Sequence, residues 1–169
     1  MRGGVANRGR YQGHGVGLVD DKGRVAIPAS LRATLAANAP RADGKGGGTI
    51  VIGAHEDSPC LIAYDPAYLD ILADDVDRRT AESLSNGRYD HNIRRAAASG
   101  EEVPFDGSGR FIMPDFPRFH AGIEEHAFFY GQFDVIEIWN PRTLLATEGL
   151  PDVMKNMATF YLKQKGIAL

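Results

Sequence analysis

Two arginines in this chain, Arg24 and Arg110, each follow a glycine and stand four residues after an aspartate. A guanidinium can form two parallel hydrogen bonds to a guanine edge or to a phosphate, which makes arginine well suited to recognising nucleic acid. Lys22 adds a point charge beside the first arginine, whereas Ser108 occupies the same place near the second. The pattern predicts a DNA-contacting set of three cations: Lys22, Arg24 and Arg110.

These residues belong to an internal repeat. The stretch 19–28 recurs, altered, as 105–114, at a constant offset of 86 residues. Each copy reads apolar, Asp, two free positions, Gly, Arg, apolar, free, apolar, Pro. An Asp followed by Gly three residues later is typical of a tight turn, because Asp can bond to backbone ahead of it and Gly adopts positive φ without strain. Each copy therefore predicts a turn, a short strand and then a helix, with four turn-organising residues in all: Asp20, Gly23, Asp106 and Gly109.

The paired motif resembles the MraZ family of bacterial transcriptional regulators, which are AbrB-like swapped-hairpin proteins. The resemblance continues through 60–64 and 136–139 and covers roughly residues 11 to 148. It implies an α+β fold in which two tandem swapped-hairpin halves form one pseudo-two-fold β-barrel core with peripheral helices. It also implies that the Asp-x-x-x-Arg element contacts DNA and that subunits form a closed ring.

A ring would multiply a weak cationic site, since useful affinity at physiological salt needs roughly six to ten phosphate contacts. Cyclic symmetry suits direct repeats in double-stranded DNA better than a palindrome. The resemblance implies action on the promoter of the protein's own cell-division and cell-wall gene cluster, in the cytoplasm at the nucleoid. Two alternatives remain open. Each Arg could pair with its own Asp and only rigidify the turn, or the protein could be an oligomeric interaction scaffold that does not touch DNA.

The bulk composition neither requires nor excludes nucleic acid as a partner. The formal net charge is −3, but residues 1–34 carry six basic and two acidic side chains, while residues 65–77 carry five Asp and no Lys or Arg. Cys60 is the single cysteine and falls in a predicted strand, so it reads as a small core residue and not as a nucleophile. We expect no enzymatic activity, no cofactor, no metal site and no membrane partner.

The chain divides into five segments. Residues 1–10 are expected to form a flexible basic tail, either solvated or acting as an arm that grips phosphate. The first repeat is placed at 11–80, a connecting segment at 81–100, the second repeat at 101–148, and an amphipathic C-terminal helix at 149–169.

Several local predictions concern the helices. A short helix is expected over 29–37, and the equivalent helix after Pro114 should be shorter because Pro117 interrupts it. Asp65 and Asn140 are predicted N-caps. The buried stripe after Asp65 should comprise Leu69, Leu72 and Val76, with the acidic residues forming a solvated face. The apolar stripe of the C-terminal helix should contain Leu150, Val153, Met157, Phe160 and Tyr161, packed on its own domain or on a neighbouring chain.

Overall fold

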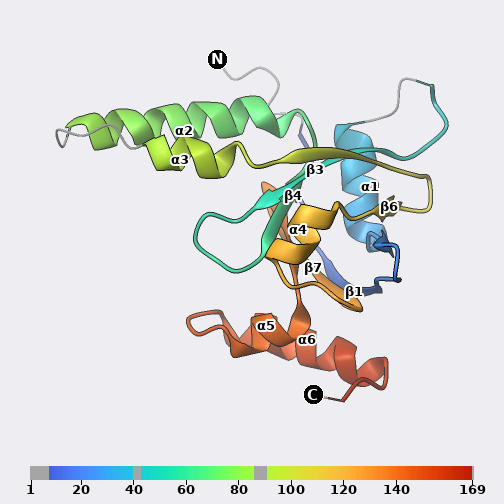
Figure 1. Cartoon of the computed structure of the whole chain (residues 1–169). Coiled ribbons are helices and arrows are strands. Elements are labelled where there is room, and N and C mark those ends of the chain that lie inside the picture. Colours follow the sequence, from blue (N-terminus) through green and yellow to red (C-terminus); the bar gives the residue numbers. More distant parts are fainter. Residues whose placement is uncertain (1–7, 40–42, 86–90, 169) are drawn as a thin grey trace.

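The computed structural model describes residues 8–39, 43–85 and 91–168, and within these ranges the chain forms eight strands and six helices (Figure 1). The strands are β1 (His14–Leu18), β2 (Arg24–Ala26), β3 (Gly48–Ala54), β4 (Leu61–Tyr64), β5 (Glu101–Phe105), β6 (Arg110–Ile112), β7 (His126–Gln132) and β8 (Val135–Trp139). The helices are α1 (Ala29–Asn38), α2 (Tyr68–Ser85), α3 (His91–Ala97), α4 (Asp115–His120), α5 (Pro141–Ala146) and α6 (Asp152–Gln164).

The fold is α+β, and its strands are divided between two antiparallel sheets. Six strands form one curled sheet, a half-barrel, in the order β1-β7-β8-β4-β3-β5. The remaining two strands, β2 and β6, pair only with each other as a short ribbon. The single barrel core that we expected is therefore a half-barrel with a separate ribbon packed against its inner face.

Strand pairing runs between the two halves of the chain more than within them. β1 pairs with β7, and β5 pairs with β3, so each half contributes a strand to the edge of the other. β4 pairs with β8, and β2 with β6. In the ribbon Val25 lies opposite Phe111, which is its own counterpart at the repeat offset of 86 residues. Val25 and Phe111 are thus paired symmetrically: exchanging each for its counterpart in the other repeat gives the same pair.

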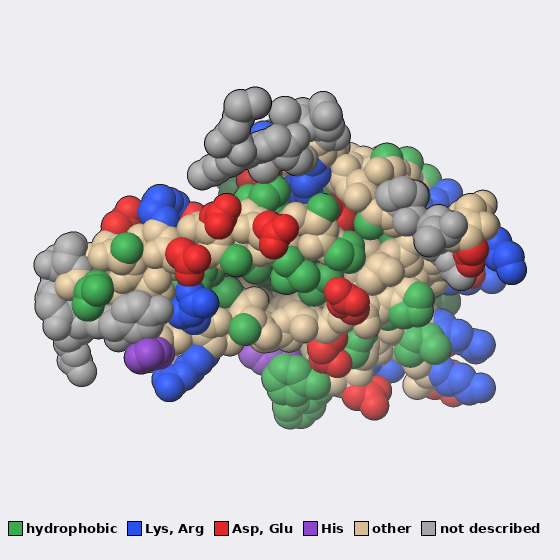
Figure 2. Space-filling view, turned by 90° about the horizontal axis from the view of Figure 1, so that it is seen from above, with side chains coloured by type: hydrophobic (Ala, Val, Ile, Leu, Met, Phe, Trp, Pro, Cys, Tyr) green, Lys and Arg blue, Asp and Glu red, His purple; other side chains and the backbone are tan. Residues whose placement is uncertain are grey.

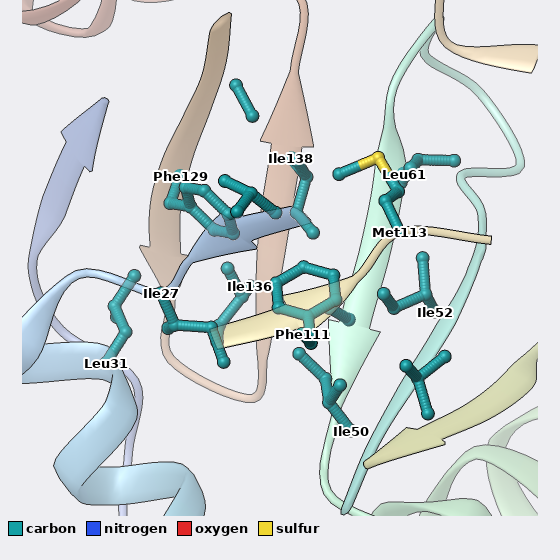
Figure 3. Close-up of a cluster of buried hydrophobic side chains, with 14 of the residues drawn as sticks. Ile27, Leu31, Ile50, Ile52, Leu61, Phe111, Met113, Phe129, Ile136 and Ile138 are labelled. Carbon is teal, nitrogen blue, oxygen red and sulfur yellow. The ribbon is translucent and has the colours of Figure 1, made fainter. Parts of the chain in front are cut away.

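The core lies between the inner face of the six-stranded sheet and the ribbon. The strands alternate with period two, so alternate residues such as Ile50 and Ile52 point to this core. Figure 3 shows Phe111 of the ribbon surrounded by side chains of both halves, among them Ile50, Ile136 and Ile138. Both halves therefore fill one shared core.

Helices cover the outer face of the half-barrel. Trp139 and Phe128 pack there against Met154 and Ala158 of α6, and Val51 and Tyr64 pack near the start of α2. Because both faces of the sheet are buried, strands such as β8 read as continuous apolar runs broken only by Glu137. That buried carboxylate accepts a hydrogen bond of 2.9 Å from the Trp139 indole.

Three helix predictions are confirmed. The helix predicted over 29–37 is present as α1, and α4 is shorter than α1 and contains Pro117. The Asn140 side chain accepts a hydrogen bond from the Arg142 backbone N–H at 2.9 Å, which makes it the N-cap of α5.

The predicted apolar stripes of two helices are wrong in part. In α6 the fully buried residues are Met154, Ala158 and Leu162, whereas Val153 and Phe160 of the predicted stripe are 54% and 59% exposed. The sequence contains both stripes at helical spacing, and contact with β1 selects the one that includes the small Ala158. In α2, Val76 is buried as predicted, but Leu69 is 41% exposed because α3 covers only part of that face.

The predicted N-cap at Asp65 is also wrong. Its side chain is fully buried and accepts hydrogen bonds from Arg8 Nε at 2.9 Å and from the Tyr11 hydroxyl at 2.5 Å. Burial, followed by this bond to Asp65, raises the pKa of Tyr11, which keeps its proton available for donation. The Arg8 side chain is 6% exposed and also stacks on the Tyr68 ring. Arg8 is thus neither a solvated tail residue nor free to grip phosphate, and residues 1–7 of the expected tail lie outside the described residues.

Replacing Arg8 should expose how much this buried ion pair contributes to stability. Arg8→Ala leaves the buried Asp65 carboxylate without its cation, and breaking a buried pair in this way costs about 3–5 kcal/mol. Arg10→Ala is the matched control, because Arg10 pairs with Asp134 at the surface and such pairs are worth under about 1 kcal/mol. Urea unfolding at one protein concentration measures both. Equal losses for the two variants would contradict the assignment.

Candidate nucleic-acid interface

Both repeat turns are built in the same way. The Asp20 carboxylate accepts hydrogen bonds from the backbone N–H groups of Lys22 and Arg24, at 3.0 and 2.9 Å. Asp106 accepts the equivalent bonds from Ser108 and Arg110, both at 2.9 Å. Each aspartate thereby satisfies backbone donors that the tight turn leaves outside the ribbon's ladder.

The glycines of these turns meet two separate demands. Gly23 and Gly109 have φ values of +83° and +79°, which L side chains rarely adopt. A Cβ atom on Gly109 would also lie 2.6 Å from Arg32 Cδ, and one on Gly23 would lie 3.1 Å from the Met113 carbonyl oxygen. The turns therefore pack tightly against the opposite half of the chain.

The ribbon directs both arginines to the same side. Val25 and Phe111 point inward and are 3% exposed, so their neighbours Arg24, Ala26, Arg110 and Ile112 point outward. Arg24 lies opposite Ile112 and Arg110 opposite Ala26 in the register. The arginines are thus the first residues of β2 and β6, on the outer face of the ribbon and not at the tips of the turns.

Arg24 and Arg110 line one surface depression. Its volume is about 490 Å³, and its lining includes Leu18, Asp20 and Ala26 in addition to the two arginines. The structure therefore brings together two of the three cations that the sequence singled out. Lys22 lies in the neighbouring turn and is exposed.

The two arginines differ in their contacts. Arg24 Nε donates to Asp20 Oδ2 at 2.6 Å, and its two terminal nitrogens make no hydrogen bond among the described residues. Arg110 makes no side-chain hydrogen bond or ion pair within the described part of the chain, although Asp106 stands four residues before it. The alternative in which each Arg pairs with its own Asp therefore holds for Arg24 alone.

Contact with Arg24 changes the acidity of Asp20. The side-chain hydrogen bond from Arg24, followed by the backbone bond from the same residue, lowers the pKa of the Asp20 carboxyl below its ordinary value. The carboxylate is consequently ionised at neutral pH and keeps the guanidinium in place.

Sequence reasoning missed Arg32 and Arg118, which also stand 86 residues apart. Arg32 of α1 donates to the Ser108 carbonyl and so braces the second turn. Arg118 of α4 donates to the carbonyls of Ile123 and Glu124, at 3.1 and 2.9 Å. Extending the repeat alignment from 28 into the following helix would have found this pair, but not the different partners of its two members.

The described regions offer little support for metal binding or for a cysteine nucleophile. They contain no group of three or more His, Cys, Asp or Glu side chains that could hold a metal ion. Cys60 is fully buried directly before β4, and burial raises the pKa of its thiol, so it stays protonated. Among the described helices, none is long and apolar enough to cross a membrane.

Comparison with known proteins finds several relatives that carry the same name. The chain is 34% identical over 134 residues to a transcriptional regulator MraZ of Rhodospirillum rubrum, covering 78% of this chain and 79% of the relative. It is 32% identical to the MraZ regulators of Ruegeria pomeroyi, covering 79% of each chain, and of Thermomicrobium roseum, covering 83% of this chain and 92% of the relative. No family model matches the chain.

These relatives are transcriptional regulators, and this α+β chain with two arginines on the outer face of its ribbon falls in the same class. The identity extends over more than three quarters of both chains in each case. The chain belongs to the MraZ family.

Titration of Asp20 tests the contact with Arg24. Because the folded-state pKa of Asp20 is depressed, its contribution to stability is present above the ordinary Asp pKa of about 3.9 and is lost as the pH falls through the lower folded value. We expect NMR titration of the carboxyl carbon to give a midpoint below the ordinary pKa of an aspartate, and Arg24→Ala to raise that midpoint. An unchanged midpoint in Arg24→Ala would show that the ion pair is absent in solution.

Proposed function

We propose that this protein is a sequence-specific regulator of transcription that binds double-stranded DNA through Lys22, Arg24 and Arg110. One observation carries the proposal: Arg24 and Arg110 stand on the outer face of one ribbon, around one depression. A two-stranded antiparallel ribbon is thin enough to enter the major groove, where arginine can bind a guanine edge with two hydrogen bonds.

The contacts of the two arginines support different parts of this role. Asp20 holds Arg24 through Nε, which orients the terminal nitrogens and lowers the entropy lost on binding. Arg110 has no such support within the described residues, and Ser108 stands where the first turn has Lys22. Arg24 therefore contributes more to affinity than Arg110.

Several copies of the chain act together in this proposal. One ribbon offers few cations, whereas firm binding at physiological salt needs roughly six to ten phosphate contacts. The two halves act as tandem swapped hairpins about a pseudo-two-fold axis, which the exchange of β1 and β5 between halves supports. Subunits form a closed ring that engages direct repeats in the promoter of the protein's own cell-division and cell-wall gene cluster, in the cytoplasm at the nucleoid.

A second candidate is an oligomeric interaction scaffold without direct DNA contact. The observation that favours it is the apolar surface beside the arginines, because Leu18 and Ile112 are both largely exposed there. Such a surface suits a subunit contact as well as a thymine methyl group. The salt dependence of binding distinguishes the two, since phosphate contacts weaken steeply with salt and an apolar interface does not.

Alanine substitution of each arginine tests the DNA contact. A lost base contact costs about 1–3 kcal/mol at each engaged site, and Arg24→Ala should weaken binding more than Arg110→Ala. Arg95→Ala, an exposed arginine on α3, is the matched control and should bind as the unaltered protein does. Gel shift or fluorescence anisotropy on the DNA upstream of the protein's own gene measures all three. If the Arg24→Ala variant binds DNA normally but has a much lower melting temperature, Arg24 serves only to stabilise the turn.

Lys22 and Ser108 offer a reciprocal pair of variants at matching positions. Lys22→Ala should lower affinity across DNA sequences and reduce the slope of log affinity against log salt by about one. Ser108→Lys should steepen the same slope, because it supplies the cation that the second turn lacks. Salt titrations by anisotropy give both slopes. If neither variant changes the slope, the turns do not lie against phosphate.

A further inference from the structure

The ribbon borders a second depression, of about 330 Å³, next to the one around Arg24. Arg110 lines both depressions. At the repeat offset of 86 residues, every lining residue of the first depression except Arg110 has its counterpart in the lining of the second. The five pairs are Leu18 and Pro104, Asp20 and Asp106, Arg24 and Arg110, Val25 and Phe111, and Ala26 and Ile112. The ribbon therefore presents two equivalent depressions, one for each repeat.

The four outward side chains of the ribbon alternate between basic and apolar. Arg24 lies opposite Ile112 and Ala26 lies opposite Arg110 in the register, and all four side chains are exposed. Opposite residues of an antiparallel pair have Cβ atoms about 4.5–5.5 Å apart. Each arginine therefore has an apolar side chain directly across from it, and a second one two residues further along its own strand.

Each depression also has one large aliphatic side chain that is open to solvent. Leu18 is 66% exposed in the first depression, and Ile112 is 59% exposed in the second. On the side of the molecule where Figure 1 labels β6, Figure 2 shows Lys and Arg side chains with hydrophobic side chains next to them. Removing apolar surface from water is favourable, so a ligand that covers Leu18 and Ile112 gains affinity from them.

The major groove of DNA offers the matching combination of groups. Guanine presents the O6 and N7 acceptors there, and thymine presents its C5-methyl group, an apolar contact on a base edge. A ribbon that lies in this groove with its arginines against guanine or phosphate brings the neighbouring aliphatic side chains to the base edges as well. The positive charge of the two arginines favours the DNA polyanion over an apolar protein surface as the occupant.

We propose that Leu18 and Ile112 read the C5-methyl groups of thymines in the operator, one in each depression. Arg24 and Arg110 then bind guanine or phosphate beside these thymines. Leu18 and Ile112 are specificity-determining residues in this arrangement, because contacts to phosphate carry no sequence information. The inference deepens the proposed function and rests on it.

Replacing thymine by uracil tests the contact without knowledge of the operator sequence. Uracil keeps the O4 acceptor of thymine and lacks only the methyl group. The DNA upstream of the protein's own gene is prepared in two forms, with thymine throughout or with uracil throughout, and fluorescence anisotropy measures binding to both. We expect the unaltered protein to bind the uracil form about fourfold more weakly or worse, since burial of one methyl-sized group contributes about that factor.

Two substitutions should remove this preference one contact at a time. Ile112→Ala and Leu18→Ala should each reduce the ratio of the two affinities, and the double variant should bring the ratio close to one. Each should weaken binding to thymine DNA and leave binding to uracil DNA nearly unchanged, because the truncated side chain has no methyl partner there. Val153→Ala shortens another exposed aliphatic side chain, on α6, and is the matched control that should keep the full ratio.

Assembly is measured separately, because an apolar surface also suits a contact between copies of the chain. Light scattering without DNA should give Ile112→Ala and Leu18→Ala the mass of the unaltered protein, and circular dichroism melts should show that both are folded. A changed mass would show that a neighbouring copy covers these residues, and it would overturn the reading of thymine.

The binding assay has further contradicting outcomes. Equal affinity of the unaltered protein for the two forms of DNA would mean that no methyl group is read. A uracil penalty that stays the same in the double variant would place the effect in the deformability of the DNA. Either result overturns the inference and leaves DNA binding through Arg24 and Arg110 intact. If the unaltered protein binds neither form, the proposed function is wrong and so is this inference.

Discussion

The structure depends on the exchange of backbone hydrogen bonds between the two halves of the chain. Buried N–H and C=O groups need partners, and β1 and β5 find theirs on β7 and β3 of the opposite half. The ribbon adds a second link, since Val25 and Phe111 face each other and seal the inner side of the half-barrel. Neither half has a complete sheet or a closed core by itself. We therefore expect the two halves to fold and unfold together.

This constraint also fixes the direction of the arginines. Because Val25 and Phe111 must face the core, strand periodicity places Arg24 and Arg110 on the outer face. The turn aspartates then hold the first residues of both strands by their backbone N–H groups. The presentation of two cations on one face of the ribbon is thus a consequence of core packing.

Much of this arrangement was predictable because it is local. The Asp-to-Gly spacing, the alternation of the strands and Pro117 in α4 all act over a few residues, and the repeat supplied their pairing. Contacts between distant segments were not predictable. Asp65 has the spacing of an N-cap, but Arg8, 57 residues away, occupies its carboxylate. Likewise Arg24 is held by Asp20, whereas Arg110 has no side-chain partner among the described residues, although the two turns are nearly identical in sequence.

The pairing of β1 with β7 also sets a timetable for the nascent chain. Val16 is opposite Phe128, so β1 finds its neighbour only after roughly 110 further residues have been synthesised. At about 5–20 residues per second, this interval on the ribosome lasts roughly 5 to 20 s. During it the edge of the incomplete sheet is open to other nascent chains. The six-stranded sheet therefore closes only after strands of the second half of the chain have been synthesised.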